Sequence, residues 1–168
     1  PVDILLLPGS YTDLGAFLDR TGMMHVVFYG PSDGGAHIYY SRALATKAAS
    51  ARAWSPPIPV GEDAAAPASV ALIGDDEGNL FVVYSGESEG PGVYAVRSSD
   101  AGHTWSEPAP IFLTQSDALY PYAICMDMDE QGRLHVVWTV NDDRGNGEAI
   151  YYARLETDHI QWSEPTVL

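Results

Sequence analysis

A repeated block of short, valine-rich segments is the feature of this sequence that most constrains its fold. Three similar stretches each follow a glycine, and they read MHVVFYG, LFVVYSG and LHVVWTV at residues 24–30, 80–86 and 134–140. The preceding glycines, Gly22, Gly78 and Gly132, recur at intervals of 56 and 54 residues. Self-similarity at a fixed period of this length indicates a tandem array of small structural units.

Each unit has the pattern of four short β-strands. A short apolar segment precedes each valine stretch, an aromatic segment follows it, and the motif Trp-Ser-x-Pro closes the unit. The preceding segments are residues 14–18, 69–73 and 122–126, the aromatic ones 38–42, 93–97 and 150–154, and the closing motifs 54–57, 105–108 and 162–165. Such Val-, Ile- and Tyr-rich runs between Gly, Pro and Asp are typical of strands. The valine stretches are apolar on both faces, which suits sheets stacked face to face.

The repeat therefore predicts an all-β fold, a β-propeller of four-stranded antiparallel blades. A β-sandwich would explain the strands but not their threefold recurrence. We expect one domain over residues 1–168, with blades at about 12–60, 66–113 and 120–168, and with residues 1–7 as the outer strand of an adjoining blade. Three blades are half of a six-bladed ring, and their exposed apolar end faces favour a homodimer or a longer propeller.

One connection carries a recognisable motif. Residues 98–105 read SSDAGHTW and place Ser98, Asp100, Gly102, Thr104 and Trp105 in the pattern Ser-x-Asp-x-Gly-x-Thr-Trp. This motif resembles an Asp-box, or BNR repeat, and the surrounding blocks resemble sialidase-like β-propellers over essentially the whole chain. The first block departs from the pattern through an Ala-rich insert at residues 43–53, and the third has Thr157 and His159 at the Asp and Gly positions. Turn chemistry and packing account for the box residues, so we expect their role to be structural.

The loops at the other end of the blades are the predicted ligand face. Antiparallel strands alternate in direction, so the blade-to-blade connections and the second-to-third turns share the end opposite the Asp-box. The resemblance implies a ligand site at that end, near the ring axis. Its candidate residues are Tyr11, Asp13, Asp63, Asp117, Tyr120 and Arg144. Tyrosines beside carboxylates suit a glycan or glycoconjugate, whereas a solvated acidic rim is the alternative.

The arginines argue against catalysis by this chain alone. The resemblance implies three arginines that clamp a carboxylate, since the guanidinium fork binds carboxylates bidentately. Arg42, Arg97 and Arg154 hold equivalent repeat positions at the Asp-box end, and only Arg144 lies on the predicted ligand face. We therefore expect a carbohydrate-recognition module without its own catalysis. Two alternatives stay open: a glycoside hydrolase completed by further blades or a second chain, and a protein-interaction scaffold.

The charge composition limits the classes of partner that this chain is expected to bind. Eight Lys and Arg against 23 Asp and Glu give a net charge of −15, which disfavours nucleic acids and anionic membranes. No apolar run is long enough to insert into a bilayer.

The lone Cys125 excludes a cysteine-based zinc site, and we expect it to be packed. No metal or cofactor is expected, with calcium at the acidic loops as an open alternative. The resemblance implies an extracellular or cell-surface location.

Overall fold

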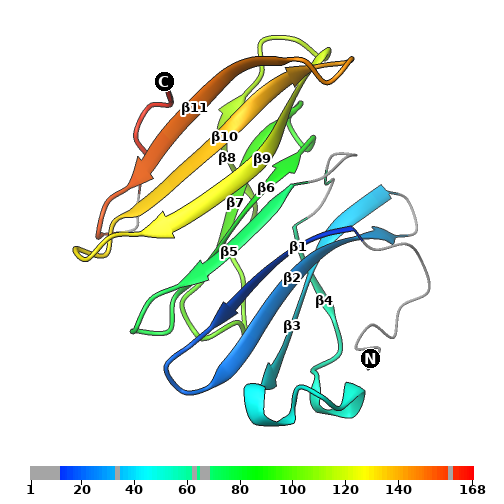
Figure 1. The fold of residues 1–168 in the computed structure, drawn as a ribbon, viewed down its shortest axis with the longest axis vertical. Coiled ribbons are helices and arrows are strands. Elements are labelled where there is room, and N and C mark those ends of the chain that lie inside the picture. Colours follow the sequence, from blue (N-terminus) through cyan, green and yellow to red (C-terminus); the bar gives the residue numbers. More distant parts are fainter. Residues whose placement is uncertain (1–11, 33–34, 62–63, 65–68, 159–160) are drawn as a thin grey trace.

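Three four-stranded antiparallel sheets stack face to face in the computed structural model, which describes residues 12–32, 35–61, 64, 69–158 and 161–168 (Figure 1). Within each sheet the strands lie in chain order, as a simple meander. The described residues contain no α-helix, only two short 3₁₀ helices, η1 (Ala45–Lys47) and η2 (Ala51–Ala53). The predicted all-β propeller fold is thereby confirmed. The strand expected at residues 1–7 lies outside the described residues.

Each sheet is one blade. Blade 1 comprises β1 (Thr12–Leu18), β2 (Met23–Ser32), β3 (Gly35–Leu44) and β4 (Ile58–Gly61). Blade 2 comprises β5 (Val70–Gly74), β6 (Leu80–Gly86), β7 (Gly92–Ser98) and β8 (Ala109–Leu113). Blade 3 comprises β9 (Leu119–Met128), β10 (Leu134–Asp142), β11 (Gly147–Leu155) and β12 (Thr166–Val167). The Ala-rich insert forms η1 and η2 between the third and fourth strands of blade 1.

The hydrophobic core lies between the blades. The interface of blades 1 and 2 buries Val27, Ile38 and Tyr40 against Leu72 and Val82. A second cluster between blades 2 and 3 is built around Val83, Val93 and Trp138. All seven residues of β6 are buried, because blade 2 is covered on both faces. The apolar character of both faces of this strand is thus a consequence of its central place in the stack.

One turn design recurs at four places. In the sequence Asp-x-x-Gly-x, the aspartate accepts backbone N–H bonds from the second and fourth residues after it, and the glycine has φ between 79° and 89°. The four turns begin at Asp19, Asp75, Asp129 and Asp142. A positive φ favours glycine because a Cβ atom would crowd the backbone. The first three turns join the first and second strands of the blades, and the fourth joins β10 to β11.

Adjacent blades are also linked where their first strands begin. The Asp13 carboxylate accepts the backbone N–H of Val70 at 3.1 Å, and the Ser69 hydroxyl accepts that of Ile124 at 2.9 Å. Asp13 lies at a bulge with φ 47°, and Ala123 has the corresponding place in blade 3 with φ 50°. The same position of each blade therefore faces the next blade. Ala123 has no side-chain acceptor to offer there.

Candidate functional site

The Asp-box loop of blade 2 is held by its own side chains. Asp100 accepts the backbone N–H groups of His103 and Thr104, at 3.0 and 2.8 Å, and the Thr104 hydroxyl at 2.7 Å. The Ser98 hydroxyl donates to Asp100 and accepts the N–H of Gly102 at 2.8 Å. The hydrogen bonds from Thr104 and Ser98 hold the pKa of the Asp100 carboxyl well below its usual range. The loop is thus a closed hydrogen-bond network with its carboxylate occupied.

This loop also covers the neighbouring blade. Gly102 lies so close to Tyr40 that a Cβ atom there would be 2.2 Å from the Tyr40 hydroxyl. The Trp105 ring meets Tyr40 edge-on, with ring centroids 5.0 Å apart. Arg42 donates to the carbonyl of Ala101. These contacts make the Asp-box part of the interface between blades 1 and 2.

Blades 1 and 3 each contain a histidine between a tyrosine and an aspartate. His25 Nδ1 lies 2.7 Å from the Tyr40 hydroxyl, and its Nε2 lies 3.3 Å from Asp19. His135 has the same arrangement, 2.8 Å from Tyr152 and 3.1 Å from Asp129. Blade 2 has Phe81 and Ala95 at the histidine and tyrosine positions. His25 and His135 are therefore equivalent strand residues, and each belongs to a relay of three hydrogen-bonded side chains.

Burial governs the ionisation of the relay in blade 1. It lowers the pKa of His25, which is 1% exposed, and the neighbouring Asp19 only partly opposes this shift. Burial also raises the pKa of Tyr40 to about 12. No substrate can reach a histidine enclosed in this way, so this relay stabilises the fold rather than taking part in chemistry.

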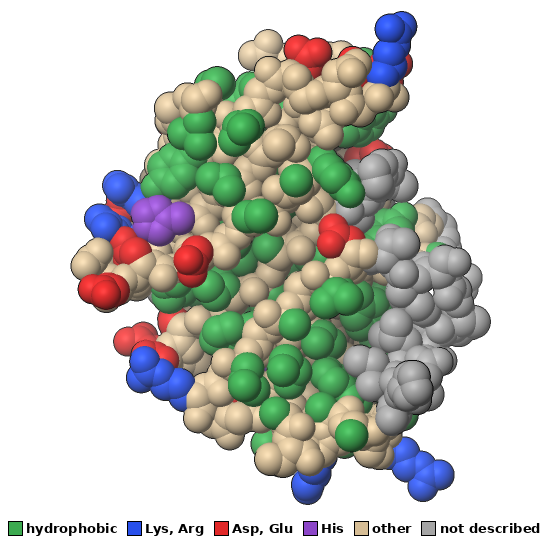
Figure 2. Space-filling view, in the orientation of Figure 1, with side chains coloured by type: hydrophobic (Ala, Val, Ile, Leu, Met, Phe, Trp, Pro, Cys, Tyr) green, Lys and Arg blue, Asp and Glu red, His purple; other side chains and the backbone are tan. Residues whose placement is uncertain are grey.

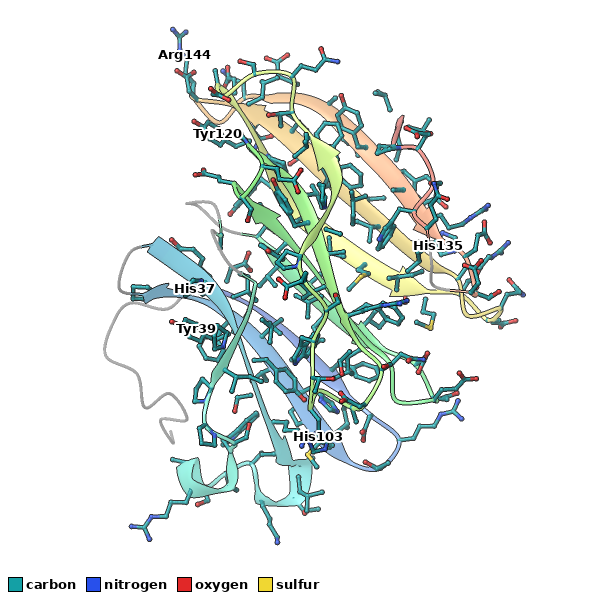
Figure 3. All side chains as sticks on the ribbon, turned by 180° about the vertical axis from the view of Figure 1, so that it is seen from behind. His37, Tyr39, His103, Tyr120, His135 and Arg144 are labelled. Atoms are coloured by element: carbon teal, nitrogen blue, oxygen red, sulfur yellow. The ribbon has the colours of Figure 1, made fainter. Side chains whose placement is uncertain are left out.

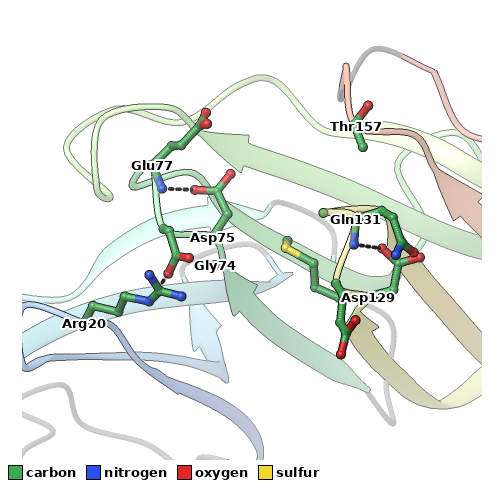
Figure 4. A pocket seen from close by; sticks show the side chains of 11 residues that line it. Arg20, Gly74, Asp75, Glu77, Asp129, Gln131 and Thr157 are labelled. Atoms are coloured by element: carbon green, nitrogen blue, oxygen red, sulfur yellow. Dashed lines mark hydrogen bonds and ion pairs between the residues drawn. The ribbon is translucent and has the colours of Figure 1, made fainter.

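A hollow of about 590 Å³ lies at the Asp-box end, between the first turns of the three blades (Figure 4). Two of its carboxylates serve the turns: Asp75 accepts the N–H of Glu77, and Asp129 that of Gln131. Arg20 pairs with Asp76 across the gap between blades 1 and 2. No aromatic residue lines this hollow. It therefore lacks the flat apolar surface on which a sugar ring would stack.

A second hollow of about 590 Å³ lies at the opposite end of blade 3. Its lining consists of Tyr120, Pro121 and Tyr122 at the start of β9, with Asn141, Asp142, Asp143 and Gly145 from the turn between β10 and β11. The register of the sheet places Tyr120 opposite Asn141. The Tyr122 side chain is 43% exposed. Two tyrosines and three polar side chains thus converge on one hollow, of a size usual for small-ligand sites.

The two aspartates of this hollow differ in what they can bind. Asp142 accepts the N–H groups of Arg144 and Asn146 and the side-chain amide of Asn146. Hydrogen bonds from Asn146 and the backbone hold the pKa of Asp142 below its usual value. Asp143 is exposed, and among the described residues its carboxylate has no hydrogen-bond or ion-pair partner. Asp143 is therefore the carboxylate that can accept hydrogen bonds from a ligand.

The predicted ligand residues are dispersed. Tyr120 lines the hollow, whereas Asp117 lies in the exposed turn before β9 and does not. Arg144 is at the tip of the β10–β11 turn and extends away from the molecule, at the end of blade 3 opposite His135 (Figure 3). The Asp13 carboxylate is engaged by Val70 in the neighbouring blade. Tyr11 and Asp63 lie outside the described residues.

Four of the other arginines are engaged at the Asp-box end. Arg20 pairs with Asp76, Arg133 with Asp129 and Arg154 with Glu156, while Arg42 holds the Asp-box loop. Every arginine of the chain lies in the described part, and among them only Arg144 is near the tyrosine-lined hollow. No three-arginine clamp can form within one copy.

Tyr122, Asn141 and Asp143 lie in loops of the predicted ligand face but were not among the candidate ligand residues. The Asp-x-x-Gly-x repeat was the available signal, since its fourth copy at Asp142 marks a turn that presents Asp143 outward. Cys125 was expected to be packed but is exposed, because no described strand packs on the face of blade 3 that carries it. The described residues contain no group of three metal-ligating side chains and no helix long and apolar enough to cross a membrane.

Solved structures of similar fold include several carbohydrate-acting enzymes. The Hadza microbial sialidase Hz136 superposes with a TM-score of 0.65 at 16% identity, covering 91% of this chain and 36% of that one. The catalytic domain of the Coprinopsis cinerea GH62 alpha-L-arabinofuranosidase gives 0.61 at 13%, covering 95% and 50%. A GH62 hydrolase in complex with xylotriose gives 0.58 at 16%, covering 95% and 51%. This chain thus spans between about a third and a half of each of these proteins, with which it shares a fold.

The family assignment rests on the sequence pattern. No curated protein is similar enough to count as a match. The pattern described as "BNR repeat-containing family member" matches residues 67–166, which cover blades 2 and 3 and include the Asp-box. The chain therefore belongs to the BNR repeat-containing family.

Proposed function

We propose that this chain recognises carbohydrate at the tyrosine-lined hollow of blade 3 and has no catalysis of its own. The observation that carries the proposal is the convergence of Tyr120 and Tyr122 with Asn141 and the unpaired Asp143. A tyrosine ring offers an apolar face to the C–H side of a sugar, and its hydroxyl offers a polar edge. Asn141 can donate and accept, and Asp143 can accept, the hydrogen bonds of sugar hydroxyls.

The charges of the hollow favour a neutral sugar. Its lining includes two carboxylates and no cation, and the Arg144 side chain points away. An acidic sugar would meet like charge, in a chain whose net charge is −15. The similarity of the fold to GH62 enzymes, one of them solved with xylotriose, is consistent with neutral glycans, and the likeness to a sialidase does not oppose it.

The absence of catalysis rests on the two aspartates. Glycoside hydrolysis uses two carboxyl groups that flank one bond, one of which must be protonated to act as an acid. Asp142 is held ionised by three N–H donors and its oxygens face the turn. Asp143 alone cannot supply both roles. A location outside the cell or on its surface belongs to the same proposal.

Glycan-array binding of the folded chain, with neutral oligosaccharides and sialylated glycans side by side, tests this function. We expect binding to neutral glycans and a loss of about tenfold or more in Tyr120→Ala and Asp143→Asn, about the worth of one stacking or hydrogen-bond contact. The matched control is Glu148→Gln, which removes the same charge from an exposed residue of β11 that does not line the hollow. Binding lost equally in the control, or no binding by the folded protein, would contradict the proposal.

The hydrolase alternative predicts a different readout. Turnover of neutral aryl glycosides by the chain, abolished by Asp143→Asn, would establish an enzyme. Capture of proteins that persists in an excess of free glycan and in Tyr120→Ala would favour a scaffold instead.

A further inference from the structure

The outer face of blade 3 repeats the face by which blade 1 binds blade 2. We call "open face" the side of blade 3 that carries His135, Val137, Thr139, Ile150 and Tyr152. By strand register these residues are equivalent to His25, Val27, Tyr29, Ile38 and Tyr40 of blade 1. Val27 and Ile38 are 0% exposed beneath blade 2, whereas Ile150 is 50% exposed. The open face thus repeats a surface that is covered in blade 1, but no described strand covers it.

The outer face of blade 1 has the complementary pattern. We call it the "front face", the side with Leu14, Ala16, Leu18, Met24 and Val26. Ala16 and Val26 hold the register positions of Leu72 and Val82, the residues by which blade 2 covers blade 1. Leu14 and Leu18 are 69% and 52% exposed. Phe28 and Tyr39, on the same face further from β1, are 5% and 9% exposed. The part of the front face along β1 therefore repeats a covering surface that is open to solvent.

The two faces point to the same side of the molecule. Figure 2 shows hydrophobic side chains gathered over β9–β11 and over β1–β3 in a single view. We propose that a second copy of this chain binds here, with the front face of each copy against the open face of the other. Such a pair has twofold symmetry, joins the first strands of the two faces as β1 and β5 are joined, and yields a six-bladed ring. This proposal does not depend on the carbohydrate site.

Charge at the rim favours the second copy as the occupant. In the existing interface Arg20 of blade 1 pairs with Asp76, the residue at the same turn position of blade 2. Blade 3 has Glu130 at this position. A second copy would therefore bring its Arg20 beside Glu130. In the existing pair the first of the two blades carries the arginine, whereas in the proposed pair the second one does.

The closing tryptophan supports the same pairing. Trp105 of blade 2 packs on Tyr40 of the preceding blade. Trp54 holds the equivalent position in blade 1, because Ser55 and Ser106, which follow the two tryptophans, bond in the same way to Arg42 and Arg97. In the proposed dimer Trp54 would lie against the partner's Tyr152, the equivalent of Tyr40.

The pairing would also bring the partner beside the proposed sugar site. Blade 1 touches blade 2 at the start of its first strand, where Asp13 accepts the N–H of Val70. The equivalent contact of blade 3 lies at Tyr122 and Ala123, and Tyr122 lines the hollow. The second copy would then lie beside the hollow, whose lining residues all belong to one chain.

Sedimentation velocity of the full chain over a range of concentrations tests the proposal. We expect a dimer of twice the 18.1 kDa chain mass. Ile150→Glu should weaken it by about tenfold or more, because it places a charge in an apolar interface. Leu113→Glu is the matched control, since Leu113 is 41% exposed on β8 of blade 2, away from both faces, and should leave the dimer intact.

A charge reversal tests the geometry without disturbing apolar packing. Glu130→Arg should weaken the dimer by opposing two arginines. Because Arg20 also pairs with Asp76 in its own chain, the restoring variant combines Glu130→Arg and Arg20→Glu with Asp76→Arg. Glycan binding measured in parallel separates the two proposals, because each can fail while the other holds. A monodisperse monomer would overturn the dimer and leave another partner to cover both faces. A dimer unaffected by Ile150→Glu and Glu130→Arg would equally overturn it.

Discussion

Blades 1 and 3 carry equivalent side chains on one face, but within the described part of the chain only the face of blade 1 is covered by another blade. Ile38 and Ile150 hold equivalent places on the third strands and are 0% and 50% exposed. His25 is enclosed, and its equivalent His135 has a side chain 31% exposed. The difference shows that a propeller blade does not bury its own apolar face, since burial is a property of the pair of blades.

The largest expected effect comes from truncating the two isoleucines. Ile38→Ala should lower the free energy of unfolding by about 2–5 kcal/mol, the cost of a cavity in a packed interface. Ile150→Ala should cost less than about 1 kcal/mol in dilute solution, because half of that side chain already meets solvent. Urea unfolding followed by tryptophan fluorescence measures both.

Concentration sharpens this comparison. If a second copy covers Ile150, the cost of Ile150→Ala should grow with protein concentration, as stability is then coupled to association. Equal costs for the two variants in dilute solution would contradict the distinction between a covered and an open face.

A smaller difference is expected between two glycines of positive φ. Gly102→Ala would place its Cβ against the Tyr40 hydroxyl and strain a backbone with φ 83°. Gly132→Ala has φ 79° but nothing within 4 Å of the new atom, so only the backbone cost remains. We expect Gly102→Ala to be the more destabilising by about 1–3 kcal/mol, the usual cost of overpacking. Thermal unfolding of the two variants decides, and equal losses would mean that the Asp-box loop is not pressed against blade 1.

The sequence was sufficient for the architecture because each blade repeats the same local pattern. The Val-Val strands, the Trp-Ser-x-Pro closures and the turn glycines mark equivalent places whatever the neighbouring blade supplies. The three four-stranded sheets therefore follow from periodicity alone. Which end carries a loop also follows, since antiparallel strands alternate in direction.

The candidate site could not be predicted as readily, because it depends on how neighbouring strands align. Asp13 and Asp143 both belong to acidic loops in the sequence, but the bulge at Asp13 turns its carboxylate toward the N–H of Val70. Asp142 is consumed by its own turn, which leaves Asp143 available. Cys125 has the sequence of a buried strand residue and is exposed because no described strand packs on its face of blade 3. Composition does not reveal these differences.

The smallest expected effect concerns the enclosed relay and pH. Burial lowers the pKa of His25 in the folded protein below the ordinary 6.5, so between these two values the unfolded chain binds a proton that the folded one does not. The stability of the fold should therefore decrease as pH falls below about 6.5. His25→Phe introduces the residue that blade 2 has at this position, Phe81, and should reduce this pH dependence. It should also lower stability at every pH, because the Tyr40 hydroxyl loses its hydrogen-bond partner.

Urea midpoints between pH 5 and 7.5 for the two proteins measure the slope rather than the level of stability. The sign is informative because the two influences on His25 oppose each other. If the ion pair with Asp19 outweighed burial, the folded pKa would be raised, and stability would instead increase as pH fell through that range. A wild-type slope of that sign, lost in His25→Phe, would mean that the interface between blades 1 and 2 admits water to the relay. His25 would then resemble the partly exposed His135 rather than differ from it.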